Sequence, residues 1–170
     1  MPRVQRILLI HPPDKAIRRF FRANLPPMGL AYLAAAARNE ADIRILDAKC
    51  EGYDHLEPIG EKFVRFGLSM ENIRLRIEDY KPDMVGVGCV VSFNWPEAAE
   101  ILRIAKSVSP DIITITGGTH PTFLAEPVLR EHPELDFVVM GEGEHTFVDL
   151  IRRLNAGDSL EGMKGIARRA

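Results

Sequence analysis

The stretch TITGGTHPTFLAEP, residues 114–127, begins as a β-branched run and breaks at two adjacent glycines, Gly117 and Gly118. β-Branched runs favour strands, and glycine lets a backbone turn sharply or lie directly against a large neighbour. The stretch therefore predicts a buried strand that ends in a bare turn. Such a turn is either only a connection or a place where a ligand meets the backbone.

Four other segments also resemble strands. Three of the five predicted strands are almost unbroken apolar runs, which is typical of central parallel strands covered on both faces. The predicted strands are residues 6–11, 42–48, 84–91, 112–117 and 136–141.

Segments with helical periodicity alternate with these strands. The segment 26–40 is small and apolar nearly all round, which predicts a buried helix close to the sheet. The helix around 122–130 contains Pro127, so we expect it to be short or bent. The other predicted helices cover residues 69–80, with Ser69 as the N-cap, 96–110 and 147–157.

The alternation of strands and helices predicts an α/β fold. We expect a doubly wound, flavodoxin-like sheet of five parallel strands in the order 2-1-3-4-5, with helices on both faces. Residues 1–170 are long enough for one core and are expected to form a single domain. Two long connections, 12–26 and 49–68, are expected to be loops. The last segment, 165–167, resembles the start of a further strand, which suggests that the chain is part of a longer protein.

The composition excludes several classes of function. The chain is 46% hydrophobic, its formal net charge is -2, and its charges are mixed, so nothing indicates a nucleic-acid partner. Its apolar runs are only strand-length, so we expect no membrane span. Two cysteines, Cys50 and Cys89, fit a reducing, cytoplasmic location better than a disulfide framework, although one bridge remains open.

The carboxyl ends of the predicted strands are where a sheet of this class binds ligands. Two of the five ends are rich in glycine: GGTHPT follows the fourth strand and GEGEHT the fifth. Glu142 and Glu144 are either an acid–base pair or caps of the next helix, and we favour capping. His11 and His120 also lie at strand ends, and we expect them to line the site or to form hydrogen bonds.

Three familiar families do not fit this edge. A dinucleotide fold needs G-x-G-x-x-G after the first strand, where this chain has HPPDKAIRR, residues 11–19. A flavodoxin phosphate loop is absent from the same place. A receiver domain needs an Asp at the end of strand three and a Lys at the end of strand five, and neither is present.

Four segments carry a specific resemblance. They are PPMGLAYLAAAA (26–37), YKPDMVGVGCVVSFNWPEAAEILRIAK (80–106), TITGGTHPTFLAEPVL (114–129) and DFVVMGEGEHTFVDLI (136–151). In order and spacing they resemble the N-terminal cobalamin-binding domain of B12-dependent radical SAM proteins, including those like the anaerobic Mg-protoporphyrin monomethyl ester cyclase. The resemblance covers residues 7–151.

The resemblance implies that cobalamin binds at the carboxyl edge, with the corrin ring over the strand ends. Gly117 and Gly118 would leave room for the nucleotide tail, and Ser92 would face it. The other cofactor-binding residues implied at this cleft are Phe93, Thr119, His120, Gly141, Glu142 and Gly143. The D-x-H-x-x-G motif, whose histidine binds cobalt in many cobalamin domains, is absent, as it often is in the radical SAM branch.

The resemblance also implies a larger enzyme of the methyltransferase or cyclase type. The C-x-x-x-C-x-x-C motif of radical SAM enzymes does not occur in these 170 residues. S-adenosylmethionine and the [4Fe–4S] cluster are therefore expected in a downstream barrel, and this chain alone is not expected to be catalytic. Two other hypotheses remain open: a regulatory or interaction domain that binds no cofactor, and a binder of another nucleotide-like ligand.

Overall fold

A computed structural model describes residues 3–19 and 22–169. Its main sheet has six strands in the order β3-β1-β6-β7-β8-β9. The first five are parallel, and β9 pairs antiparallel with β8. The strands are β1 (Arg6–His11), β3 (Asp42–Asp47), β6 (Met84–Gly88), β7 (Ile113–Gly117), β8 (Phe137–Val139) and β9 (Ile166–Arg168).

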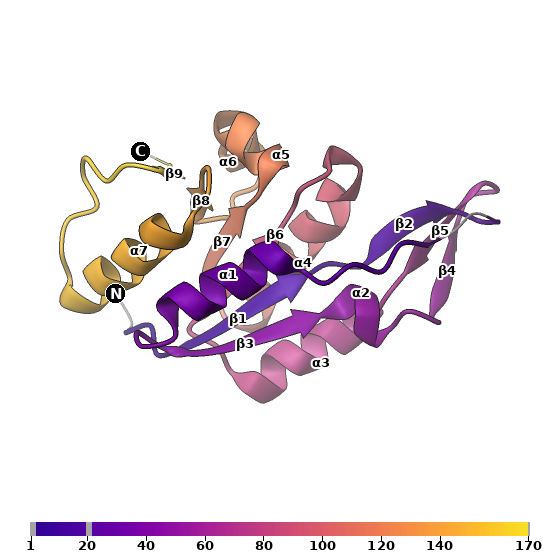
Figure 1. Cartoon of the computed structure of the whole chain (residues 1–170), viewed down its shortest axis with the longest axis horizontal. Coiled ribbons are helices and arrows are strands. Elements are labelled where there is room, and N and C mark those ends of the chain that lie inside the picture. Colours follow the sequence, from indigo (N-terminus) through magenta and orange to yellow (C-terminus); the bar gives the residue numbers. More distant parts are fainter. Residues whose placement is uncertain (1–2, 20–21, 170) are drawn as a thin grey trace.

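Helices cover both faces of this sheet (Figure 1). Helices α1 (Met28–Ala37) and α7 (Glu144–Ala156) share one core with the strands, and α3 (Met70–Tyr80) and α4 (Trp95–Val108) share the other. The short elements are α2 (Ala48–Glu51), the 3-10 turn η1 (Ser92–Asn94), α5 (Thr119–Phe123) and α6 (Ala125–Glu131).

The expected α/β class, with a mostly parallel central sheet, is confirmed. Ser69 caps α3 as predicted, because its side chain accepts a hydrogen bond from the Asn72 amide. Numbered among themselves, the five parallel strands lie in the order second, first, third, fourth, fifth. The predicted total of five was wrong, because residues 166–168 add a sixth strand. Arg169 helps to hold this strand in place by donating to the carbonyl oxygens of Leu135 and Pro133.

The two long connections are not plain loops. They contain β2 (Asp14–Ile17), β4 (Leu56–Ile59) and β5 (Phe63–Phe66), which pair antiparallel in a second sheet of order β2-β5-β4. This second sheet, here called the arm, projects from the carboxyl edge of the main sheet in Figure 1. The arm could not be predicted because each strand has only four residues, and β2 pairs with a segment almost fifty positions later.

Two helical predictions need correction. Helix α1 is not buried: among its residues only Leu30 and Ala37 are buried, while Met28 and Tyr32 are about half exposed. It packs on the sheet with one face and leaves the other to solvent. The segment expected as one short or bent helix around 122–130 is short as predicted, but it consists of two helices that meet at Leu124. Pro127 lies in the first turn of α6 and does not interrupt it.

A search of the described residues finds no helix long and apolar enough to cross a membrane. The longest helix, α4, has only 14 residues, whereas a span needs about 20.

Candidate cofactor site

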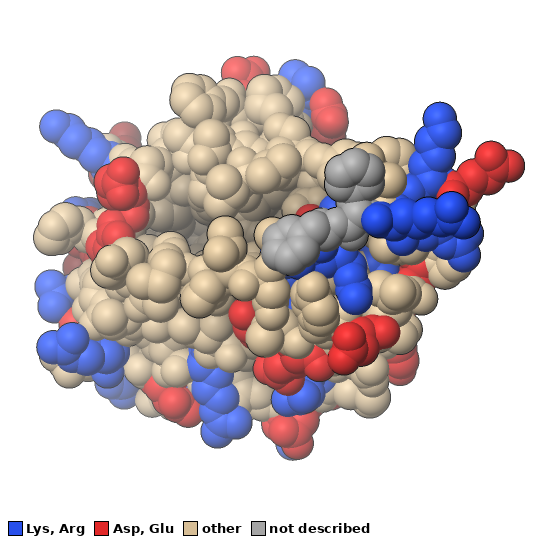
Figure 2. Space-filling model, turned by 45° about the vertical axis from the view of Figure 1, so that its right-hand side comes forward, with Lys and Arg blue, Asp and Glu red and all other residues tan. Residues whose placement is uncertain are grey.

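A cavity of about 520 Å³ opens at the carboxyl edge of the main sheet. It lies between the ends of the strands and α1, and we call it the edge cavity. Figure 2 shows a hollow on this side of the molecule, bordered mainly by uncharged residues, while Lys, Arg, Asp and Glu gather on the surrounding surface. Its volume is that of a typical small-molecule site.

The floor of the edge cavity is a strip of nearly bare backbone. Gly86 pairs with Ile115, and Gly88 pairs with Gly117, so these residues of β6 and β7 share one face of the sheet. All four line the cavity. A methyl group on Gly86 would lie 2.7 Å from a methyl of Leu9, and one on Gly117 would lie 3.2 Å from the Val139 oxygen. Side chains at these glycines would therefore crowd their neighbours and fill the cavity.

Gly117 and Gly118 have different roles, which resolves the question raised by their turn. Gly117 is the end of the cavity floor. Gly118 has φ 107° and ψ -177°, a conformation that is almost confined to glycine. An added Cβ would lie 2.5 Å from the carbonyl oxygen of Cys89. Gly118 therefore lets the turns after β6 and β7 approach each other, and the His120 amide donates to that same oxygen.

The GEGE turn, residues 141–144, follows β8 and closes the cavity at that end of the sheet. Gly141 and Gly143 both have positive φ, 72° and 75°, and both line the cavity together with Glu142 and Glu144. No side chain caps α7, whose N-cap is Gly143. The preferred capping role of Glu142 and Glu144 therefore does not take the form of a side-chain hydrogen bond. Glu144 does lie in the first helical turn, where a carboxylate is favourable.

The other predicted residues lie beside the cavity and not in its lining. Ser92 Oγ and His120 Nδ1 are 2.8 Å apart, so the structure brings these two together. Thr119 is exposed at the start of α5. Phe93 stacks instead against Phe63 of the arm, with Lys15 over its ring. Of the nine predicted residues, Gly117, Gly118, Gly141, Glu142 and Gly143 line the cavity.

His120 is a buried histidine held neutral by its surroundings. Its ring stacks on Trp95 at a centroid distance of 5.0 Å, and Nε2 is buried without a hydrogen-bond partner. Burial lowers the pKa of His120 below its ordinary value of 6.5. The imidazole therefore packs against the Trp95 ring in its uncharged form.

Acid should destabilise the chain through His120. Below pH 6.5 the unfolded chain binds a proton at this position more readily than the folded chain, so the free energy of unfolding should fall as the pH is lowered. The slope can reach about 1.4 kcal/mol per pH unit in the window between the folded and unfolded pKa values. Urea unfolding at several pH values, followed by the fluorescence of Trp95, the only tryptophan, measures it. His120→Gln should flatten the slope in this window; an unchanged slope would contradict this role.

A charged cluster at the β1 end of the cavity was not predicted. Lys49 is buried and pairs with Asp14 at 2.7 Å, and Asn94 donates to the same carboxylate. Beside them, Lys15 of the arm pairs with the buried Glu97 of α4 at 2.9 Å. Buried charges need such partners, so these pairs fix the arm to the core. No local signal could have shown them, because the partners lie 35 to 82 positions apart in the sequence.

No metal-ligand set is visible in the described part of the chain. Groups of three or more His, Cys, Asp or Glu side chains that could hold an ion are absent from residues 3–19 and 22–169. His11 Nδ1 lies 2.9 Å from Asp47 Oδ1 and donates to this carboxylate, and the histidine lines the cavity. Both cysteines are free, and burial raises the pKa of the Cys89 thiol to about 12.

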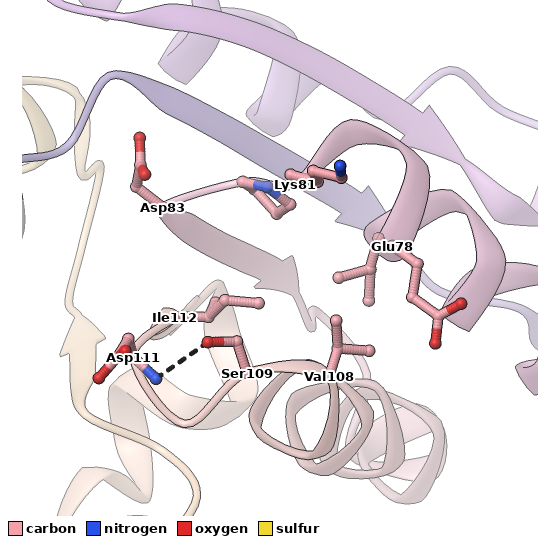
Figure 3. A pocket seen from close by; sticks show the side chains of 9 residues that line it. Glu78, Lys81, Asp83, Val108, Ser109, Asp111 and Ile112 are labelled. Atoms are coloured by element: carbon pink, nitrogen blue, oxygen red, sulfur yellow. Dashed lines mark hydrogen bonds between the residues drawn. The ribbon is translucent and has the colours of Figure 1, made fainter.

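A second cavity, of about 350 Å³, lies at the opposite edge of the sheet, between the ends of α3 and α4. Figure 3 shows that the charged ends of Glu78, Lys81 and Asp83 point in different directions. Asp83 already accepts hydrogen bonds from the amides of Gln5 and Arg6. Because its polar groups do not converge, this cavity is not a candidate site.

Comparisons with known proteins agree with the geometry. The model of the B12 binding domain family matches residues 15–151. An uncharacterized methyltransferase of Pyrococcus horikoshii is 36% identical over 166 residues, which are 97% of this chain and 33% of that protein. The anaerobic magnesium-protoporphyrin IX monomethyl ester cyclase of Rubrivivax gelatinosus is 34% identical over 154 residues, 89% of this chain and 25% of the cyclase.

A solved structure shares the fold. The apo form of the cobalamin-dependent S-adenosylmethionine radical enzyme OxsB superimposes with a TM-score of 0.68 at 21% identity, over 98% of this chain and 21% of that one. The chain thus spans about a third or less of the proteins it resembles. The family match over most of its length, with the glycine-floored cavity at the carboxyl edge, shows that this chain belongs to the B12-binding domain family.

Proposed function

We propose that this chain binds cobalamin in the edge cavity and serves as the cobalamin-binding domain of a larger radical SAM enzyme of the methyltransferase or cyclase type. The observation that carries the proposal is the apolar cavity between α1 and the glycine strip of β6 and β7, in a chain of the B12-binding family. The fold alone would not identify a ligand, because related α/β sheets host many functions.

The residues present fit the cofactor. Cobalamin joins a broad corrin ring to a nucleotide tail that carries a flat base. The cavity volume of about 520 Å³ suits the tail. Leu9, Gly86, Gly88, Ile115 and Gly117 would hold the tail from the sheet side, together with the turn at Gly118, and the turn at Gly141–Gly143 would lie along the corrin.

When bound, the cofactor would supply group-transfer or electron-transfer chemistry that no side chain offers. The contribution of this chain is to hold and orient it. The charged cluster of Asp14, Lys49 and Asn94 would offer hydrogen bonds at the corrin edge. Ser92 and His120, beside Gly118, are proposed to support the turn that contacts the tail, and Phe93 and Thr119 to flank it.

Exposed apolar side chains around the cavity mouth support a covering domain. Leu25 and Val90, which line the cavity, are 71% and 69% exposed, and exposed apolar side chains gathered beside a cavity mark an interaction site. We propose that the catalytic barrel of the parent protein, with S-adenosylmethionine and a [4Fe–4S] cluster, lies over this mouth. The chain covers only part of these relatives, which leaves room for such a domain. We also propose a cytoplasmic location, which the two free cysteines support.

Titration with hydroxocobalamin tests the proposal. The purified chain is mixed with increasing hydroxocobalamin, passed through gel filtration and examined by absorbance spectroscopy. We expect a corrin band that co-elutes with the folded chain and is not displaced by ATP or NAD. Displacement by these nucleotides would favour a general nucleotide binder. A folded chain, and a folded parent protein, that both elute without corrin would contradict the proposal; the empty regulatory domain is not favoured by the family match.

A further inference from the structure

The outer end of the arm exposes a row of apolar side chains. Ile17, Phe63 and Ile59 lie directly opposite one another in the last pairs of the two strand ladders, so they share one face of the arm. The buried Phe66 lies on the other face, because it is an odd number of positions from Phe63. Phe63 stacks against Phe93, but Ile17 and Ile59 remain 49% and 38% exposed. We call these three opposed residues the tip row.

Basic side chains border the tip row at the end of the arm. Arg18 and Arg19 follow β2, and Lys62 lies in the turn between β4 and β5. The Arg18 amide donates to the carbonyl oxygen of Lys62 at 2.9 Å, so these two turns lie side by side. All three basic side chains are exposed. The tip therefore places positive charge next to exposed apolar surface.

The charge of the tip has the opposite sign to that of the whole chain. The chain has a formal net charge of -2, whereas the tip segments 17–19 and 59–63 contain three basic residues and one acidic residue. Figure 2, in which the side of the molecule with the arm comes forward, shows Lys and Arg side chains together at the right. Such a tip is complementary to a surface that carries negative charge outside and is apolar beneath.

We propose that the tip of the arm docks on an anionic lipid bilayer. Ile17 and Ile59 enter the headgroup region, and the basic side chains of the tip meet the lipid phosphates. This inference is independent of the proposed cofactor function. The arm leaves the carboxyl edge of the main sheet, so the bilayer would lie on the side where the edge cavity opens (Figure 1).

The shape of the arm favours a bilayer over a protein partner. The arm projects from the rest of the chain (Figure 1), and a bilayer receives a projecting tip without a complementary pocket. A stable protein interface instead covers about 800 Å² on each partner, more than a short row of side chains offers. Pro58 lies in the outer strand β4 and has no amide hydrogen, which opposes the addition of a partner strand at that edge.

Co-sedimentation with vesicles tests the proposal. The purified chain is centrifuged with vesicles made of equal parts of phosphatidylglycerol and phosphatidylcholine, and with vesicles of phosphatidylcholine alone. We expect binding to the anionic vesicles to be at least about 10-fold stronger, since each basic side chain near such a surface adds attraction. Binding should weaken when NaCl is raised from about 50 to about 500 mM, because salt screens these charges.

The charged border is tested by removing two of its charges. The double variant Arg18→Gln, Lys62→Gln should bind anionic vesicles about 30-fold more weakly, because each basic side chain contributes about 5-fold. The matched control Lys164→Gln, Arg168→Gln removes the same charge at exposed positions in and just before β9. It should bind like wild type, because β9 lies at the far edge of the main sheet from β3 and away from the arm (Figure 1).

The tip row is tested by a matched pair of isoleucines. Ile59→Thr should weaken vesicle binding by about 5-fold, because it removes apolar surface that enters the bilayer. Ile45→Thr makes the same change on β3 at a residue that is also 38% exposed, and it should leave binding unchanged. Thermal unfolding of every variant confirms that it is folded.

Three results would overturn the proposal. The first is a folded wild-type chain that sediments no more with anionic vesicles than without vesicles. The second is an equal loss of binding in the tip variants and their controls, which would show that net charge and general apolarity drive the binding. The third is a dimer in gel filtration that Ile59→Thr dissociates, which would assign the tip row to an interface between two copies of the chain.

Discussion

Leucine at position 29 should abolish cobalamin binding and leave the chain folded. Gly29 lies on the first turn of α1 and lines the edge cavity, and a Cβ added there meets no atom within 4 Å. A leucine at this position can therefore occupy part of the edge cavity without displacing protein atoms. An aromatic base buries roughly 150–250 Å², worth about 4–6 kcal/mol at most, so its exclusion should weaken binding by at least about 100-fold.

Hydroxocobalamin titration and thermal unfolding of the same samples check this result. The melting temperature of Gly29→Leu should equal or exceed that of wild type, since leucine is a better helix former than glycine. Ala36→Leu is the matched control, because it adds a leucine to the same helix at an exposed position outside the cavity. Full cobalamin affinity in a folded Gly29→Leu chain would show that the tail does not use the edge cavity beside α1.

The largest loss of stability should come from Gly118→Ala. The φ of 107° with ψ of -177° strains any residue with a Cβ, at a cost of about 1–3 kcal/mol. The new methyl would also lie 2.5 Å from the Cys89 oxygen and 2.9 Å from its carbonyl carbon, both backbone atoms. Relief requires the ends of β6 and β7 to separate, so we expect a total loss of about 3–5 kcal/mol.

Urea and thermal unfolding measure this loss. A fall in melting temperature of roughly 6–20 °C corresponds to it for a chain of this size. Gly141→Ala is the matched control: its φ is also positive, 72°, but an added Cβ meets nothing within 4 Å. It should cost only about 1–2 kcal/mol. Equal losses in the two variants would mean that backbone conformation alone, and not the approach to Cys89, makes Gly118 necessary.

Much of the architecture was open to prediction because its causes are local. Apolar runs such as 84–88 and 113–117 mark strands covered on both faces, and the stripes of α3, α4 and α7 mark helices with one buried side. The glycine turns after β7 and β8 were also visible, and the resemblance gave them a function. Five of the nine predicted site residues line the edge cavity for this reason.

The other site residues show where such reasoning stops. Thr119 directly follows Gly118 and Ser92 follows the end of β6, yet neither side chain is in the cavity lining. His120 also lies outside the cavity lining, because it packs on Trp95 and contacts Ser92. Adjacency in the sequence does not determine orientation, because successive side chains at a strand end point in different directions.

By itself, the sequence determined the class of fold, the edge of the sheet at which the cavity lies and the family to which the domain belongs, since short-range patterns encode all three. Only the tertiary structure decided the arm, the sixth strand, the ion pairs of Lys15 and Lys49, and the edge cavity beside α1. These features join residues that are far apart in the chain. Their pairing depends on strand register and on packing across the two cores, which no local pattern records.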